Sequence, residues 1–252
     1  MTSTELSAIL MDEQVERQLR YFWEYISRSV PELGAMAMKD GRGRHKDTVE
    51  HTIMVTAKTP ARLRVRLCAL FHDVGKPDTR KIEDDGTVSF HGHEQLGAKM
   101  TTRILKELGY DKELASQVGR LVGLSGATKG SQGWGEAAIR RFDKEAGELL
   151  EDLLDFVVED VTSRHQVNHD RVKTEIATLW RRIREVRAAD EAAKWRPVVS
   201  GDEIMERYGL RPGKQVGEAI KTVSAAQKAA EEIGGTFTKD DAWAILDSGF
   251  TK

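Results

Sequence analysis

The chain has 252 residues, 32% of them charged, and a formal net charge of −2 at pH 7, so it can bury a large core but does not have the basic excess of a protein that coats nucleic acid. No apolar run approaches the roughly 20 residues of a membrane span, and the acidic N-terminus lacks the pattern of a secretory signal. The lone cysteine, Cys68, lies in an apolar helical pattern, so we expect a cytoplasmic protein without a membrane partner.

The first third of the chain predicts helices separated by a basic connection. Apolar residues recur at helical spacing over 12–30, and Pro31 is expected to end that helix. Residues 34–46 are rich in Gly, Lys and Arg and indicate a connection. The sequence Asp47-Thr-Val-Glu50 has the form of a capping box, which puts His51 in the first turns of the next helix.

An apolar pattern over 62–74 predicts a helix that carries His72 and Asp73 in its last turn and stops at Gly75. An imidazole and a carboxylate are therefore expected where the core would otherwise continue. Burying an unpaired carboxylate costs several kcal/mol. These two groups consequently require polar or metal partners from elsewhere in the chain.

The next segments alternate between helices and loops. Residues 81–90 predict a short hairpin or an exposed loop, and a helix is expected over 94–108. Asp111 is expected to cap the next helix, whose stripe is Leu114, Val118, Leu121, Val122 and Ser125. The segment 126–135 is rich in Gly, Ser, Thr and Lys, so it is either a lid or a loop.

A later helix, expected over 148–164, has Asp160 on the same face as its apolar stripe. A long amphipathic helix over 170–194 follows, and two shorter helical patterns lie beyond Pro197. The fold class is therefore all-α. We divide the chain into an N-terminal helix with a basic linker, a metal-binding domain and a helical C-terminal tail, over residues 1–46, 47–165 and 166–252.

Two imidazoles and two carboxylates on three predicted helices form a candidate metal site: His51, His72, Asp73 and Asp160. This nitrogen and oxygen donor set suits one divalent transition metal (Mn, Ni, Co, Fe or Zn), with Mg as an alternative. Such an ion activates water and polarises a phosphorus centre. The competing interpretation is that these are unrelated helix residues, with His72 bonded only to a backbone carbonyl.

Other polar residues near this pattern are candidates for contacts with a phosphate. Lys76 supplies a point charge close to Asp73. His91 and His93 lie at a helix start, where an imidazole can orient a metal ligand, contact a phosphate or bind a second metal. The arginine-rich face of helix 170–194 fits a solvated surface better than an RNA surface.

At these residues the chain resembles the HD superfamily of metal-dependent phosphohydrolases, whose His, His-Asp and distant Asp correspond to His51, His72-Asp73 and Asp160. It resembles in particular the C-terminal HD region of bacterial, actinobacterial-type CCA-adding tRNA nucleotidyltransferases. That resemblance rests on Arg44-His-Lys-Asp-Thr-Val-Glu-His-Thr52, Leu70-Phe-His-Asp-Val-Gly-Lys-Pro-Asp-Thr-Arg80, Val88-Ser-Phe-His-Gly-His-Glu94, Ala138-Ile-Arg-Arg-Phe142, Glu159-Asp-Val-Thr-Ser-Arg164 and Gly201-Asp-Glu-Ile-Met205.

The resemblance implies an HD-type helical bundle that hydrolyses phosphoester bonds of nucleotides or RNA ends, as a 2′,3′-cyclic phosphodiesterase, 2′-nucleotidase or phosphatase. We expect Asp73 to orient or deprotonate the attacking water, with Lys76 and His93 as the other catalytic residues. The expected substrate-binding residues are Lys76, Arg80, His91 and His93. A tRNA is a further expected partner, and the oligomeric state is left open.

Two departures from that family shape the expectations. No Gly-Gly phosphate loop or Asp-x-Asp pair precedes His51, so we do not expect this chain to add CCA. Ser125 stands where a histidine usually follows the Leu-Val-x-Leu stretch, so we expect one metal ion rather than two. Two other functions remain open: a tRNA- or RNA-binding module without catalysis, and a phosphohydrolase of nucleoside or deoxynucleoside triphosphates.

Overall fold

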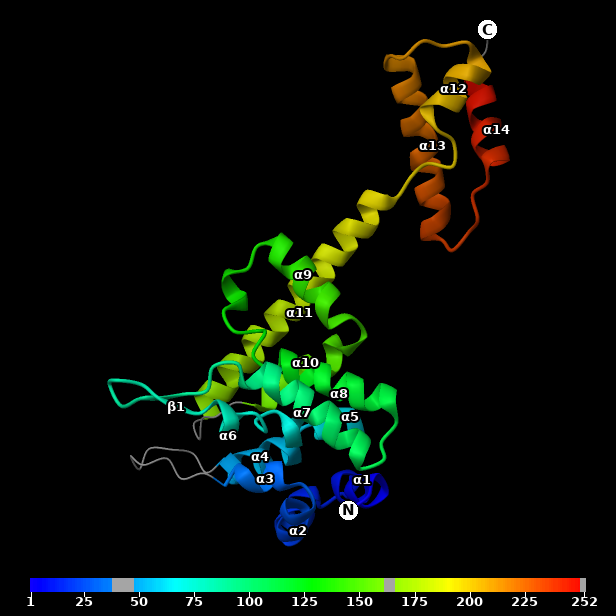
Figure 1. Cartoon of the computed structure of the whole chain (residues 1–252). Helices are drawn as coiled ribbons and strands as arrows, with labels where there is room; N and C mark the ends of the chain where they lie inside the picture. The colour runs from blue at the N-terminus through cyan, green and yellow to red at the C-terminus, as the bar shows by residue number, and fades with distance from the viewer. Residues whose placement is uncertain (38–47, 161–165, 250–252) are drawn as a thin grey trace. The chain divides into compact units, whose positions relative to one another are not determined.

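The computed structural model describes residues 1–37, 48–160 and 166–249. Within these ranges the structure is almost entirely helical, and the one sheet is a two-stranded hairpin. The prediction of an all-α fold is therefore confirmed (Figure 1). The chain divides into two compact units, Met1–Val186 and Arg187–Lys252, while the boundaries expected at residues 46 and 165 remain predictions.

The first unit contains most of the secondary structure. Its long last helix, α11, runs on into the second unit. The described elements, in chain order, are α1 (Ser3–Met11), α2 (Val15–Ser29), α3 (Pro31–Ala35), α4 (Thr48–Lys58), α5 (Leu63–Phe71), α6 (Lys76–Thr79), β1 (Lys81–Ile82), β2 (Val88–Ser89), α7 (His93–Glu107), α8 (Lys112–Leu124), η1 (Ser131–Gly133), α9 (Glu136–Ala146), η2 (Gly147–Leu149), α10 (Leu150–Glu159) and α11 (Gln166–Lys194).

The N-terminal helices differ from the single helix predicted over 12–30. Helix α1 was not predicted. A capping box between Thr2 and Glu5 begins it, and its Leu6 and Leu10 are fully buried. Pro31 begins α3 rather than simply ending a helix, because the first turn of a helix tolerates its missing N–H. The capping residue expected at position 47 lies outside the described residues.

The helix predicted over 62–74 is shorter in the structure, because α5 ends at Phe71. The chain then turns through residues 72–75, with the backbone N–H of Lys76 donating to the carbonyl oxygen of Asp73 at 3.0 Å. A Cβ atom added at Gly75 would lie 2.3 Å from the His93 carbonyl oxygen. Glycine therefore allows this turn to pass directly against α7, and His72 and Asp73 lie in the turn rather than in a helix.

A hairpin connects α6 to α7, and this confirms one of the two predictions for residues 81–90. Strands β1 and β2 pair antiparallel, with Lys81 opposite Ser89 and Ile82 opposite Val88. After the three residues that follow β2, α7 begins at His93.

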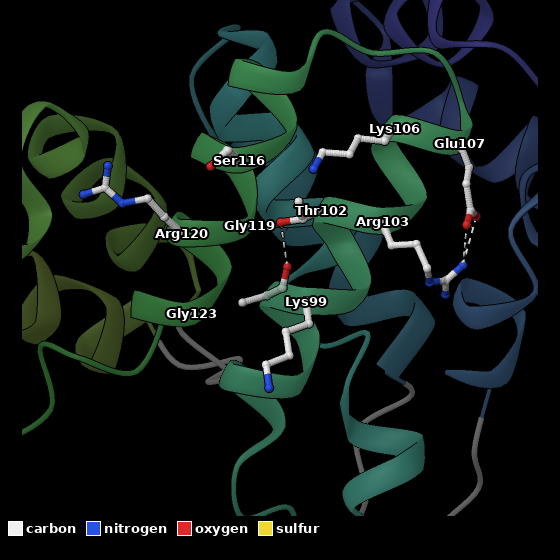
Figure 2. Close-up of a pocket in the computed structure, with 10 residues that line it drawn as sticks. Lys99, Thr102, Arg103, Lys106, Glu107, Ser116, Gly119, Arg120 and Gly123 are labelled. Atoms are coloured by element: carbon white, nitrogen blue, oxygen red, sulfur yellow. Dashed lines mark hydrogen bonds and ion pairs between the residues drawn. The ribbon is translucent and has the colours of Figure 1, made fainter.

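Helices α7 and α8 pack closely because small residues lie between them (Figure 2). The Thr102 hydroxyl donates to the Ala98 carbonyl oxygen at 2.9 Å. A Cβ atom added at Gly119 would lie 2.0 Å from that hydroxyl oxygen. This contact leaves a groove along the two helices that exposes mainly basic side chains.

An ion-pair cluster joins α10 to the start of α5. The Asp152 side chain, 4% exposed, forms an ion pair with Arg62 Nη1 at 2.7 Å and accepts a hydrogen bond from Arg64 Nε. Leu153 and Phe156 of the predicted apolar stripe are fully buried. Helix α10 is thus held with its C-terminal end, which Asp160 follows directly, against the residues after α5.

The second unit has its own small core. It contains α12 (Gly201–Tyr208), α13 (Lys214–Glu232) and α14 (Lys239–Gly249). Ser200 and Glu203 form a capping box at the start of α12. The buried residues of this core are Val199, Ile204, Val216, Ala219, Val223, Ala242 and Leu246.

Candidate metal centre

Three segments bring two imidazoles and a carboxylate together. His51 lies in α4, while His72 and Asp160 lie just beyond the ends of α5 and α10. His51 Nε2 is 3.2 Å from His72 Nε2 and 3.0 Å from Asp160 Oδ1, and His72 Nε2 is 3.4 Å from the same oxygen. Within the described part of the chain, these three residues form a cluster whose ligand atoms all lie within 4.8 Å of one another.

The tautomer of His72 suits a metal ligand. Its Nδ1 lies 2.8 Å from the Ala69 carbonyl oxygen, to which it donates its hydrogen. With the hydrogen on Nδ1, the Nε2 lone pair is directed at the cluster. The same backbone hydrogen bond was expected if His72 were an ordinary helix residue, so the bond alone does not identify a metal ligand. His51 and His72 are 6% and 2% exposed, and the Asp160 side chain is 27% exposed. Two enclosed imidazoles and a partly open carboxylate fit a divalent metal of borderline softness.

Electrostatics favour a protonated His72 in the absence of a metal. Burial opposes the charge on the imidazole most strongly, but the Asp73 and Asp160 carboxylates outweigh it and raise the pKa of His72 to about 9. Burial likewise opposes the charge on Asp160, yet His72 and His51 hold the pKa of this carboxyl below its usual value. Protons and a metal ion therefore compete for the same nitrogen.

Asp73 lies beside this cluster but makes different contacts. Its Oδ2 is 3.2 Å from His72 Nε2 and accepts from Lys76 Nζ at 2.6 Å. Its Oδ1 is 3.8 Å from His93 Nε2. The cluster of mutually close ligand atoms does not include Asp73, so its role as a fourth metal ligand remains a prediction.

His93 is oriented by its neighbours. Its Nδ1 lies 2.8 Å from the Phe90 carbonyl oxygen and 3.1 Å from Glu94 Oε2. Both acceptors stabilise a hydrogen on Nδ1, so the Nε2 atom near Asp73 is the one available to a ligand. Lys76 Nζ lies 5.6 Å from the centre of the Phe90 ring, a cation–π distance that restrains this lysine.

A cavity of about 580 Å³ opens over the cluster. His51, His72 and Asp160 line it together with Asp73, Lys76 and His93. Arg80 and His91 are not among its lining residues, and His91 is exposed, so their roles as substrate contacts remain predictions. The remaining lining residues are Glu94, Ser125, Gly126, Thr128, Lys129, Gly130, Ser131, Gln132, Val157, Arg171, Val172, Glu175 and Ile176.

The loop that follows α8 forms one wall of this cavity, and contacts with α7 and α11 hold it. Lys129 Nζ lies 3.7 Å from Glu94 Oε1 of α7. Arg182 of α11 donates to the carbonyl oxygens of Ser131 and Trp134. The Trp134 ring packs 5.2 Å from that of Phe142, so this residue anchors the loop on the core.

Sequence reasoning did not identify the cavity residues of α11. Arg171 and Glu175 form an i,i+4 pair, the same signal that a solvated helix gives. Glu94 was noted only as the neighbour of His93. In α11, the neighbours Val172 and Ile176 of this pair face the core, but Glu185 has the same position beside the core residue Val186, so this pattern does not single the pair out.

Comparison with known proteins agrees with this geometry. Residues 42–138 match the HD domain family. The chain is 33% identical over 214 residues to the A-adding tRNA nucleotidyltransferase of Deinococcus radiodurans, which covers 82% of this chain and 48% of the relative. It is 32% identical over 224 residues to the CC-adding tRNA nucleotidyltransferase of Thermus thermophilus, which covers 86% of this chain and 48% of the relative.

The chain thus spans about half the length of these curated relatives. HD domains bind divalent metals, and His51, His72 and Asp160 form a site that can hold one. Among the described helices, none is both long and apolar enough to cross a membrane. Residues 42–138 therefore match the HD domain family, and the chain resembles these tRNA nucleotidyltransferases over most of its length.

Proposed function

We propose that this chain is a metal-dependent phosphohydrolase that cleaves phosphoester bonds of nucleotides or RNA ends in the cytoplasm. The observation that carries the proposal is the cavity itself. It places a His–His–Asp cluster and the Asp73, Lys76 and His93 side chains around one space. A structural metal site would need only the enclosed ligands, not a cavity with additional acid–base groups and a cation.

The nitrogen and oxygen donors of the His–His–Asp cluster support the proposal that a divalent metal binds here. His51, His72 and Asp160 would hold it, with Asp73 as the proposed fourth ligand. When bound, a divalent metal supplies Lewis acidity at the phosphoester and activates a water nucleophile. Mn, Ni, Co, Fe and Zn suit two imidazoles and carboxylates, with Mg as the alternative of lower affinity.

The remaining residues divide the proton transfers between them. The Asp73 carboxylate, held by Lys76 at 2.6 Å, can accept the proton that the attacking water loses. The water oxygen bonds to phosphorus while the ester P–O bond breaks. His93, when its imidazole is protonated on both nitrogens, can donate the Nε2 proton to the leaving oxygen, and the Lys76 ammonium stabilises the negative charge on the phosphate.

The test is metal-dependent turnover. Metal-stripped protein, refilled in turn with Mn, Ni, Co, Zn and Mg, would be assayed with 2′,3′-cyclic AMP, 2′-AMP, p-nitrophenyl phosphate and several dNTPs. We expect release of phosphate or nucleoside monophosphate that an Asp73→Ala variant loses. Release of pyrophosphate or tripolyphosphate would instead support the triphosphate hydrolase.

A second candidate is binding of RNA without catalysis, and the groove between α7 and α8 supports it (Figure 2). Lys99, Lys106 and Arg120 are exposed along this groove of about 740 Å³. Clustered cations bind phosphate backbones without reading sequence. The named activities of both relatives concern tRNA. Retained tRNA binding together with no turnover under any metal would favour this candidate.

A further inference from the structure

Four residues of α11 line the cavity, and the roles proposed above use none of them. They are Arg171, Val172, Glu175 and Ile176, spaced as two adjacent pairs one helical turn apart. Residues at these positions form a single stripe on a helix. The stripe therefore contributes a continuous wall to the space that contains the His–His–Asp cluster.

This wall combines an apolar surface with an ion pair. Val172 and Ile176 pack against the core, and Val157 of α10 adds a third aliphatic side chain to the cavity lining. Arg171 Nε lies 3.8 Å from Glu175 Oε1. Aliphatic side chains can contact the face of a flat ring, while a carboxylate and a guanidinium can pair with polar groups on its edge.

Glu175 is more enclosed than an ordinary acid of a surface ion pair. The same helix has a matched pair outside the cavity, Arg181 with Glu185, joined at 2.6 Å. The Glu185 side chain is 58% exposed, whereas that of Glu175 is 29% exposed. Glu175 lines the cavity, and its pair with Arg171 is longer than that of Glu185 with Arg181, so its carboxylate is available to a ligand there.

The cavity is large enough for more than a phosphate group. Its volume of about 580 Å³ lies within the range of ligand pockets. The metal cluster and Lys76 account for a phosphate, and Thr128, Ser131 and Gln132 add neutral donors and acceptors from the loop. A matching ligand has an anionic group for the metal cluster, hydroxyl groups for the loop, and a flat heterocycle with a polar edge for the wall formed by α11.

We infer that Arg171, Val172, Glu175 and Ile176 form the wall that binds the nucleoside part of the substrate, with Glu175 as a specificity-determining residue. This inference rests on the proposed function for the position of the phosphate. The substrate class is then a small nucleotide or a terminal nucleotide unit whose base or ribose reaches α11. A simple phosphomonoester fills only the end of the cavity near the metal cluster.

The experiment measures binding, so it does not depend on turnover. The probes are a phosphonate analogue of adenosine monophosphate, which has no ester bond to hydrolyse, and inorganic phosphate. Each is titrated calorimetrically into the Mn²⁺-loaded chain. We expect the analogue to bind about tenfold more tightly than phosphate or better, which corresponds to roughly 1.4 kcal/mol of contacts to the nucleoside.

Two double variants then locate the nucleoside contact. In Arg171→Gln/Glu175→Gln we expect affinity for the analogue to fall to within about twofold of that for phosphate, since polar contacts to the nucleoside are lost. In the matched Arg181→Gln/Glu185→Gln control, both affinities stay unchanged. Equal affinity of the parent chain for the two probes, or equal losses in the two variants, would overturn the inference.

The outcomes separate this inference from the proposed function. Tight analogue binding that depends on Arg171 and Glu175, combined with no hydrolysis under any metal, rejects the hydrolase and retains the nucleoside wall. Metal-dependent hydrolysis with no preference for the analogue over phosphate rejects the wall and retains the hydrolase.

Discussion

His51 Nε2 and Asp160 Oδ1 lie 3.0 Å apart, although 109 positions separate the two residues in the sequence. Helix α4 supplies the first and the end of α10 the second, while His72 lies within hydrogen-bonding distance of both. The ring of Phe156 packs 5.4 Å from that of His72. The cluster therefore depends on how α10 packs against the residues that follow α5.

Replacing Asp160 tests whether this cluster binds the metal. Asp160→Asn keeps the size of the side chain but removes its charge. We expect metal affinity to fall by at least about 100-fold, because even residues that only support a ligand can change affinity by 10–100-fold. Competition with a chelating dye measures the loss. The control is Glu151→Gln on the same helix, whose side chain is 75% exposed, and similar affinities for the two variants would contradict the assignment.

The ion-pair cluster under α10 is a second target. Asp152→Asn removes the carboxylate charge that pairs with Arg62 and Arg64, at a site where the acid is buried and both arginines are partly exposed. We expect the free energy of unfolding to fall by about 1.5–3 kcal/mol, the range for hydrogen bonds to charged groups. Urea unfolding followed by circular dichroism measures the change. A loss as small as that of Glu151→Gln would show that the cluster contributes little.

The His–His–Asp cluster could be predicted because His72 and Asp160 break an apolar pattern. Asp160 follows the stripe of Leu153 and Phe156, and His72 follows a fully buried run that ends at Phe71. A polar group in such a position needs a partner, and this requirement can be read from a single sequence. The prediction located three of the residues that the structure brings together, although it placed His72 inside a helix rather than in a turn.

The wall contributed by α11 could not be predicted in the same way. This helix has several i,i+4 pairs of Arg and Glu, and only the packing of α11 selects Arg171 and Glu175 over Arg181 and Glu185.

Helix α1 was missed because its nine residues give few repeats of an apolar pattern. A long-range contact retains it: Arg66, buried beneath it, donates to the Leu10 carbonyl oxygen at 2.5 Å.

The turn at Gly75 predicts a strict requirement for glycine. Its φ of −81° suits any residue, so what opposes substitution is the approach of an added Cβ to the backbone of α7, at 2.3 Å from the His93 carbonyl oxygen and 2.8 Å from the Gly97 nitrogen. We expect Gly75→Ala to destabilise the fold by about 1–3 kcal/mol and to weaken metal binding, because overpacking displaces the turn. Gly133→Ala is the control, since nothing lies within 4 Å of its added Cβ. Equal melting temperatures for the two variants would refute this explanation.

Cys68 provides a probe of the same region. Its side chain is fully buried, and burial, together with the nearby Asp160 and Asp152 charges, raises the pKa of the thiol. Because only the thiolate is nucleophilic, we expect iodoacetamide to label the native protein much more slowly than the unfolded chain. Mass spectrometry of timed samples measures the rates. Rapid labelling under native conditions would show that α5 opens readily.

The metal-free protein should lose stability as the pH rises. The carboxylates of Asp73 and Asp160 raise the pKa of His72 from 6.5 to about 9, against the effect of burial. A group whose pKa is higher in the folded chain than in the unfolded chain stabilises the fold fully when the pH is below the unfolded-state pKa. This contribution disappears as the pH rises through the folded-state pKa. We therefore expect the free energy of unfolding in EDTA to decline between pH 6.5 and pH 9.

A bound metal should reverse this trend. It competes with the proton for Nε2 of His72, so its own contribution grows as the pH rises. Urea unfolding with EDTA and with Mn²⁺, at both ends of this pH range, measures the difference. His72→Asn should remove both effects, whereas His91→Asn, at an exposed position outside the cavity, should retain them. A metal-free protein that becomes more stable towards pH 9 would show that the two carboxylates do not hold the proton on His72.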